Sequence, residues 1–164
     1  MQTTNSTIVI APVESRNDIE IARDIFREYE AAIGVDLCFQ DFGREMAGLP
    51  GDYAPPGGHL LLALAGGAPA GCIALRSLAA DACEMKRLYV RPAYQGSGLG
   101  RTLVERVIAL AREAGYGAMF LDTLPSMEAA QHLYTRLGFR DTEPYRRNPV
   151  AGSRFMVLKL GRPE

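Results

Sequence analysis

The stretch from Tyr94 to Gly100, YQGSGLG, has residue types and a spacing that suit the binding of a negatively charged group. Its glycines occupy every second position, and the next fifteen residues, RTLVERVIALAREAG, have the apolar periodicity of a helix. A helix begins with unpaired backbone N–H groups, and preceding glycines let several of them converge without side chains in the way. The pattern predicts a pyrophosphate site. The alternative is a tight strand-to-helix turn that needs glycine for its own geometry.

Two common phosphate loops do not match this stretch. A P-loop would end in Gly-Lys-Ser/Thr, whereas Arg101 and Thr102 follow Gly100, and a dinucleotide loop would read GxGxxG rather than GxGxG. A third pattern does match. QGSGLG (95–100) is QxxGxG, the strand-like run EMKRLYV (84–90) precedes it, and AAQHLYTRLGF (129–139) contains AxxLYxxxGF. In this order, the three pieces resemble the GCN5-related N-acetyltransferase (GNAT) family over roughly residues 8–160.

The resemblance implies that acetyl-CoA is the acetyl donor and that its pyrophosphate lies on the glycine loop. The residues that this assigns to the pyrophosphate are Gln95, Gly96, Ser97, Gly98, Leu99, Gly100, Arg101 and Thr102. The strand Leu88, Tyr89 and Val90 would pair with the pantetheine arm through its backbone, with Asp122 and Thr123 near the arm. Arg91 and Arg101 would supply positive charge for the phosphates.

Acetyl transfer to an amine needs a proton acceptor and a proton donor. An amine of pKa about 10 is neutral in roughly one molecule per thousand at pH 7, so it must lose a proton before it attacks a thioester. The departing thiolate then needs a proton, and the resemblance assigns this to Tyr134; the alternative is a core tyrosine. Counted back from the glycine loop, Glu84 matches the glutamate that acts as base in the histone-acetylating branch of the family it resembles. Alternation would place Glu84, Lys86, Leu88 and Val90 on one face, from which the carboxylate could face the cleft. An ion pair of Glu84 with Lys86 or Arg87, and deprotonation through a water chain, remain alternatives.

The sequence departs from the family pattern at Met127, where many members have an asparagine that holds the pantetheine. We expect Ser126 to cap the following helix instead. We expect the acceptor to be a small-molecule amine or a peptide. An amine that also carries a carboxylate would suit the arginines and aromatic residues expected around it; the alternative is that these are ordinary rim residues. The expected lining of the acceptor site is Phe26, Tyr29, Phe39, Phe42, Tyr53, Arg76, Tyr145, Arg146 and Arg147.

The elements that position these residues can be read from apolar periodicity and turn residues. Strands are expected at 6–13, 59–65, 70–76, 83–90, 118–124, 139–142 and 154–160, and helices from Ser15 to Gly34 and at 37–46, 99–114 and 128–137. This order predicts a mixed α/β (α+β) fold. It has one mostly antiparallel sheet of about six to seven strands, one βαβ crossover and about four flanking helices.

Composition limits the remaining possibilities. The 164 residues suit a single domain (1–164), and 18 basic against 19 acidic residues make a nucleic-acid partner unexpected. We expect neither a signal peptide nor a membrane span, and the three cysteines (Cys38, Cys72 and Cys83) are expected to be reduced, so the expected compartment is the cytoplasm. His59 and His132 lack metal-ligand spacing, so no metal is expected, and the protein is expected to be a monomer or homodimer. Two rival functions stay open: a catalytically silent acyl-CoA-binding module on the same fold, and a mononucleotide-binding module.

Overall fold

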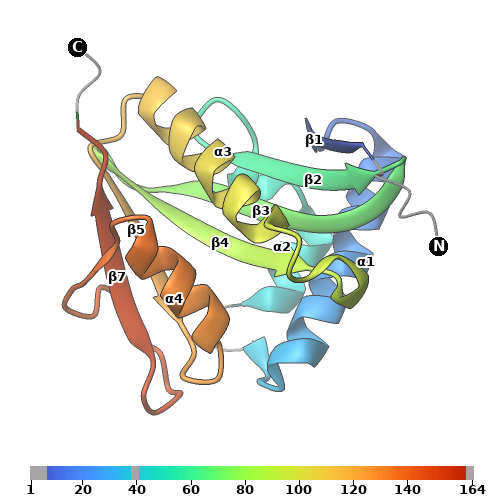
Figure 1. The fold of residues 1–164 in the computed structure, drawn as a ribbon. Coiled ribbons are helices and arrows are strands. Elements are labelled where there is room, and N and C mark those ends of the chain that lie inside the picture. Colours follow the sequence, from blue (N-terminus) through green and yellow to red (C-terminus); the bar gives the residue numbers. More distant parts are fainter. Residues whose placement is uncertain (1–6, 38–40, 162–164) are drawn as a thin grey trace.

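The computed structural model describes residues 7–37 and 41–161 of the chain. It contains the expected mixed fold, with a central sheet between two layers of helices (Figure 1). The seven strands are β1 (Ile8–Pro12), β2 (His59–Ala65), β3 (Ala68–Ala79), β4 (Ala82–Val90), β5 (Ala118–Thr123), β6 (Arg140–Asp141) and β7 (Arg154–Lys159). The helices are α1 (Arg16–Ile33), α2 (Phe42–Gly48), α3 (Leu99–Glu113) and α4 (Glu128–Arg136), with short 3₁₀ turns η2 (Gly51–Tyr53) and η3 (Pro92–Tyr94).

The sheet has the order β1-β2-β3-β4-β5-β7-β6. Every neighbouring pair is antiparallel except β4 and β5, which α3 connects as a parallel crossover. Parallel neighbours need such a long connection, whereas the meander β2–β3–β4 closes with short turns. The expected fold class is therefore confirmed, including its single crossover.

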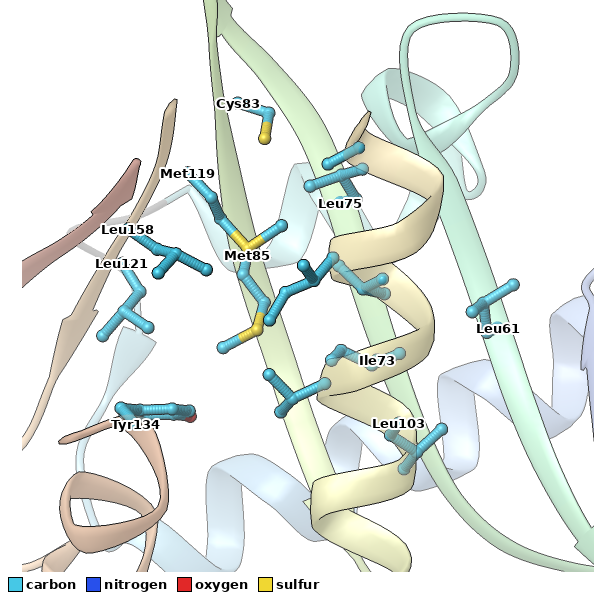
Figure 2. Close-up of a cluster of buried hydrophobic side chains, with 14 of the residues drawn as sticks. Leu61, Ile73, Leu75, Cys83, Met85, Leu103, Met119, Leu121, Tyr134 and Leu158 are labelled. Atoms are coloured by element: carbon cyan, nitrogen blue, oxygen red, sulfur yellow. The ribbon is translucent and has the colours of Figure 1, made fainter. Parts of the chain in front are cut away.

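Two hydrophobic cores lie on the two faces of the sheet. On one face α3 packs Leu103, Val104 and Val107 against β3, β4 and β5 (Figure 2). On the other face α1 packs Ile25 and Phe26 against β2 and β3, together with α2 and Tyr53. Cys72 and Cys83 are buried free thiols in these cores, whereas Cys38 lies outside the described residues.

Local signals set the ends of α1. Ser15 accepts a hydrogen bond from the Asp18 amide, and the Asp18 carboxylate accepts one from the Ser15 amide, which forms a capping box. Gly34 ends the helix in a left-handed conformation. Both ends agree with the sequence prediction.

One helix start and one helix cap differ from the prediction. Of the helix expected over 37–46, residues 38–40 lie outside the described residues, and α2 begins at Phe42 because Asp41 has a left-handed backbone (φ 58°) that a helix cannot include. Helix α4 is preceded by Met127 rather than by a capping Ser126, and no side chain caps it. The predicted cap is therefore wrong; a turn from the Leu124 carbonyl to the Met127 amide enters the helix instead. None of the described helices is long and apolar enough to cross a membrane.

Candidate active site

The glycine loop has the backbone conformation that an anion site requires. Gly96 and Gly98 have φ of 79° and 85°, and Gly98 stands at the N-cap of α3 with no side-chain cap. A Cβ placed on either glycine would meet nothing within 4 Å, so this side of the loop is open space. The Gln95 side chain donates to the Val90 carbonyl and the Thr102 hydroxyl to the Gly98 carbonyl, which hold the loop between β4 and α3.

The two arginines expected beside the phosphates have other contacts. Arg91 is turned toward α1, where its guanidinium forms an ion pair with Glu28 (2.8 Å) and donates to the Pro69 carbonyl. Arg101 forms an exposed pair with Glu105 one turn later on α3. The expectation that Arg91 serves the phosphates is therefore not supported by its contacts, and the loop offers mainly backbone N–H groups.

A groove of about 370 Å³ extends from this loop along the end of β4. Its walls are Leu88, Tyr89 and Val90 on one side and the start of α4, from Ser126 to Ala130, on the other. Met127 replaces the family's asparagine in this wall, so the groove has an apolar thioether here instead of a side-chain amide.

The groove leads to a place where β4 and β5 separate. These strands pair only at Ala82–Ala118, Cys83–Met119 and Glu84–Phe120 and then diverge (Figure 1). A narrow cavity of about 30 Å³ lies between the diverging edges, and it shares Leu88 and Met127 with the groove. Its other lining residues come from α1, β4, β5, α4 and the segment before β7: Tyr29, Ile33, Leu37, Met85, Lys86, Arg87, Leu121, Asp122, Thr123, Leu124, Tyr134 and Asn148.

A β-bulge in β4 borders this cavity. Arg87 has a left-handed backbone (φ 61°), and the pairing with β3 shifts between Cys72–Tyr89 and Ala74–Lys86. The Arg87 side chain points to the α1 and α2 face, where Glu45 binds it at 2.8 Å and 3.0 Å. The extra residue reverses the alternation, so Leu88 and Val90 pack on the α3 face while Glu84 lies on the opposite face with Arg76. The prediction that Glu84, Leu88 and Val90 share one face is therefore wrong.

Tyr134 lies at the wall of the cavity. It is 4 % exposed, and its ring packs on Phe139 with 5.7 Å between centroids. Figure 2 shows it at the border of the α3 core, beside Leu121. Burial, with the nearby Tyr29 and Asp122, raises the pKa of its hydroxyl, so the group keeps its proton at neutral pH. Across the cavity the hydroxyl of Thr123 is buried and has no hydrogen-bond partner within residues 7–37 and 41–161.

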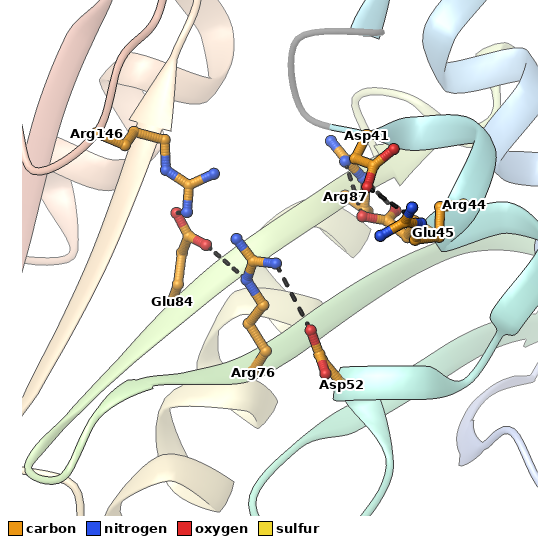
Figure 3. A network of polar contacts seen from close by, with 8 residues as sticks. All are labelled: Asp41, Arg44, Glu45, Asp52, Arg76, Glu84, Arg87 and Arg146. Carbon is orange, nitrogen blue, oxygen red and sulfur yellow. Dashed lines mark hydrogen bonds and ion pairs between the residues drawn. The ribbon is translucent and has the colours of Figure 1, made fainter.

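Glu84 is fully buried, and three donors hold its carboxylate, of which Figure 3 shows Arg76 and Arg146. Arg76 binds one oxygen at 2.9 Å, and Tyr145 (2.6 Å) and Arg146 bind the other. Burial raises the pKa of Glu84, but Lys86, the Tyr145 hydrogen bond and the two arginines outweigh it, and the net result is a lowered pKa. The Glu84 carboxylate is thus ionised, and both of its oxygens are bound by these side chains. An ion pair with Lys86 or Arg87 was the expected alternative. In the structure the carboxylate binds residues of β3 and of the segment before β7, whereas Arg87 binds Glu45.

The residues expected around the acceptor divide into two groups. Phe26, Phe42 and Tyr53 are buried core residues between α1, α2 and the sheet. Arg76, Tyr145 and Arg146 gather at Glu84, and Tyr29 lines the cavity. A hollow of about 300 Å³ opens on Arg76 from the side of α2 and η2. Arg147 is exposed, and Phe39 lies outside the described residues.

Comparison with known proteins identifies the family. The family model described as acetyltransferase (GNAT) family matches residues 19–139. The chain belongs to the GNAT acetyltransferase family. A curated GNAT relative is an uncharacterized N-acetyltransferase of Schizosaccharomyces pombe, 38 % identical over 159 residues, which cover 96 % of this chain and 98 % of the relative.

Solved GNAT structures have the same fold. The crystal structure of a GNAT acetyltransferase from Staphylococcus aureus Mu50 has a TM-score of 0.81 at 22 % identity and covers 94 % of this chain and 100 % of its own. A PaiA N-acetyltransferase from Thermoplasma acidophilum, crystallised in complex with coenzyme A, has a TM-score of 0.70 at 22 % identity and covers 93 % of this chain and 99 % of its own.

Sequence reasoning about this GNAT chain missed two features of the cavity. Lys86 is buried beside it, and Asn148, from the segment before β7, donates to the Asp122 carboxylate at 3.1 Å. Lys86 could have been noticed as one of three charged residues, with Glu84 and Arg87, in a central strand. The contact between Asn148 and Asp122 joins residues 26 positions apart, so no local pattern could indicate it.

Proposed function

We propose that this protein transfers an acetyl group from acetyl-CoA to the amine of a small molecule or peptide, by direct attack of the amine on the thioester. The observation that carries the proposal is the continuity of three features: the open glycine loop, the groove along β4, and the cavity that contains Tyr134. Pyrophosphate, pantetheine arm and thioester would lie in them in that order.

The residues present fit coenzyme A. The Gly96 and Gly98 backbone leaves room for phosphate oxygens, and the first amides of α3 supply donors there. Leu88, Tyr89 and Val90 present a strand edge that β5 does not use, which suits the amides of a pantetheine arm. The buried Thr123 hydroxyl lacks a partner in the described chain, and an arm in the gap would supply one.

Bound acetyl-CoA would supply the activated acetyl group, and the chain would supply proton transfer and exclusion of water. Tyr134 holds a proton in a buried site and would give it to the thiolate as the carbon–sulfur bond breaks. A backbone amide near Leu88 or Tyr89, beside the bulge, would stabilise the charge that develops on the carbonyl oxygen. Glu84 stays our candidate base, acting while Arg76, Tyr145 and Arg146 hold it; a water chain is the alternative.

The rival on the same fold is a silent acyl-CoA-binding module. Tyr134 favours the enzyme, because a pure binder has no use for a proton donor at the sulfur. Incubation of the protein with acetyl-CoA and a panel of amines (amino acids, polyamines and peptides) separates the two. An enzyme releases coenzyme A over many turnovers only with certain amines, and mass spectrometry finds one acetyl group on the amine. Acetyl-CoA binding with no release across the panel would favour the silent module.

A further inference from the structure

Lys86 is an unusual lysine in this chain. The 164 residues contain sixteen arginines but two lysines, Lys86 and Lys159. Lys159 is exposed at the end of β7, whereas Lys86 is 6 % exposed in the middle of β4. Lysine is almost never buried to this extent unless its amine is paired, because burial of an ammonium group is costly.

The position of Lys86 links it to the proposed chemistry. It is the residue before the bulge at Arg87, and it lines the same narrow cavity as Tyr134 and Thr123. That cavity is where the thioester would lie. Lys86 is therefore an amine of the protein itself, placed on the wall of the compartment in which an amine is expected to be acetylated.

The surroundings of Lys86 favour its neutral form. Burial lowers its pKa most, the neighbouring Arg87 and the more distant Arg146 and Arg76 lower it further, and Glu84 raises it, with a result of about 7. The other titratable groups that line the cavity are Asp122 on β5, Tyr29 on α1 and Tyr134 on α4. An ordinary lysine is neutral in about one molecule in 2500 at pH 7, so the lowered pKa greatly increases the neutral fraction of Lys86.

We propose that Lys86 is a self-acetylation site, whose Nζ takes the acetyl group from the acetyl-CoA bound to the same chain when no acceptor amine is present. This rests on the proposed function. The neutral Nζ attacks the thioester carbon, a carbon–nitrogen bond forms and the carbon–sulfur bond breaks. The thiolate takes a proton from Tyr134, and the proton lost from Nζ restores that hydroxyl, so the products are coenzyme A and acetyl-Lys86.

Acetylation of Lys86 would change the cavity in two ways. It abolishes the charged form of Lys86 beside Glu84, and it adds an acetyl group to a narrow cavity of about 30 Å³. The modified side chain would compete with a new thioester for this space. Self-acetylation would therefore switch off the chain that carries it.

The test uses the full-length protein and acetyl-CoA without an added amine. Mass spectrometry of peptides follows acetylation of Lys86 over time, with Lys159 as the exposed reference in the same molecule. Gly98→Val, which blocks the loop, is compared with Gly115→Val. Gly115 has almost the same φ (86°) at the far end of α3, where a Cβ also meets nothing within 4 Å. A second experiment mixes Gly98→Val with isotope-labelled wild type, to ask whether one chain acetylates another.

We expect Lys86 to be acetylated at least about a hundredfold faster than Lys159, because placement beside a bound thioester raises its effective concentration. In Gly98→Val, Lys86 should be acetylated no faster than Lys159, both alone and in the mixture with wild type. In Gly115→Val, Lys86 should keep its faster rate. If acetyl-CoA raises the melting temperature of the wild type while Lys86 stays unmodified, the self-acetylation proposal is wrong and the proposed function stands. Equal acetylation of Lys86 in Gly98→Val alone would also overturn it. If acetyl-CoA leaves the melting temperature unchanged, both proposals fail.

Discussion

At the scale of single residues, Tyr134 has the clearest chemical assignment. Tyr134→Phe keeps the ring that packs on Phe139 and removes one hydroxyl. Loss of a positioned general acid slows turnover by about 10²–10⁴-fold, so kcat should fall by that factor while acetyl-CoA affinity stays nearly unchanged. Steady-state kinetics and calorimetry measure the two quantities. A wild-type kcat in this variant would show that Tyr134 is a core residue and not the proton donor.

Glu84 gives a prediction about stability and one about catalysis. Its folded-state pKa is lowered, so its ionised form stabilises the fold above the ordinary carboxyl pKa of about 4.3, and this part is lost as the pH falls through the folded value. Glu84→Gln leaves Arg76 and Arg146 without their buried carboxylate, and should cost about 3–5 kcal/mol at pH 7. The difference from wild type should shrink in acid, as urea unfolding at several pH values would show.

The catalytic part of the same variant separates a base from a structural anchor. If Glu84 takes the proton, kcat/KM of Glu84→Gln falls most at neutral and acidic pH and recovers at high pH, where the free amine is abundant. A loss that is the same at every pH would assign Glu84 to holding the segment that carries Tyr145 and Arg146. Circular dichroism checks that the variant is folded under each condition.

At the scale of elements, the link between β4 and α3 is where we propose that the cofactor binds. Gly98→Val should abolish acetyl-CoA binding, because valine is strained at φ 85° and its side chain would occupy the open space of the loop. Gly115→Val carries the same strain at the other end of α3 and should retain binding. Calorimetry with both variants separates a specific loss from general destabilisation. Unchanged affinity in Gly98→Val would remove the pyrophosphate assignment.

The elements also show what the sequence can predict. The ends of α1, the meander and α3 depend on neighbours within a few positions, such as the Ser15–Asp18 cap and the Gly66-Gly67 turn, and they were predicted within a few residues. The bulge at Arg87 depends on Glu45, 42 positions away, which binds the guanidinium on the other face of the sheet. The motifs indicated which elements form the groove and the cavity, and the roles assigned to their residues stay predictions. The contacts of Glu84 with Tyr145 and Arg146 join segments about sixty residues apart, so local patterns could not show them.

At the scale of the whole molecule, ligand choice should appear in thermal stability. A ligand that binds only the folded chain raises the melting temperature by an amount that grows with its concentration over its Kd. We expect acetyl-CoA to raise it and ATP and NAD at equal concentrations to leave it nearly unchanged, because the groove along β4 suits a pantetheine arm. Differential scanning fluorimetry measures all three. An equal shift with ATP would favour the mononucleotide-binding alternative.

The three residue pairs between β4 and β5 are the hydrogen-bonded joint between two parts of the sheet, β1–β4 and β5–β7. Beyond Glu84 and Phe120, the backbone groups of β4 and β5 that face each other form no hydrogen bonds between the two strands. The backbone amides of β4 and β5 that face this gap should exchange with deuterium faster than the amides in the middle of β3, because β3 is paired with a strand on each side. A molecule that fills the gap as an additional strand would slow this exchange selectively at residues 88–90. Deuterium uptake there would thus report occupancy of the gap directly, before any acceptor amine is known.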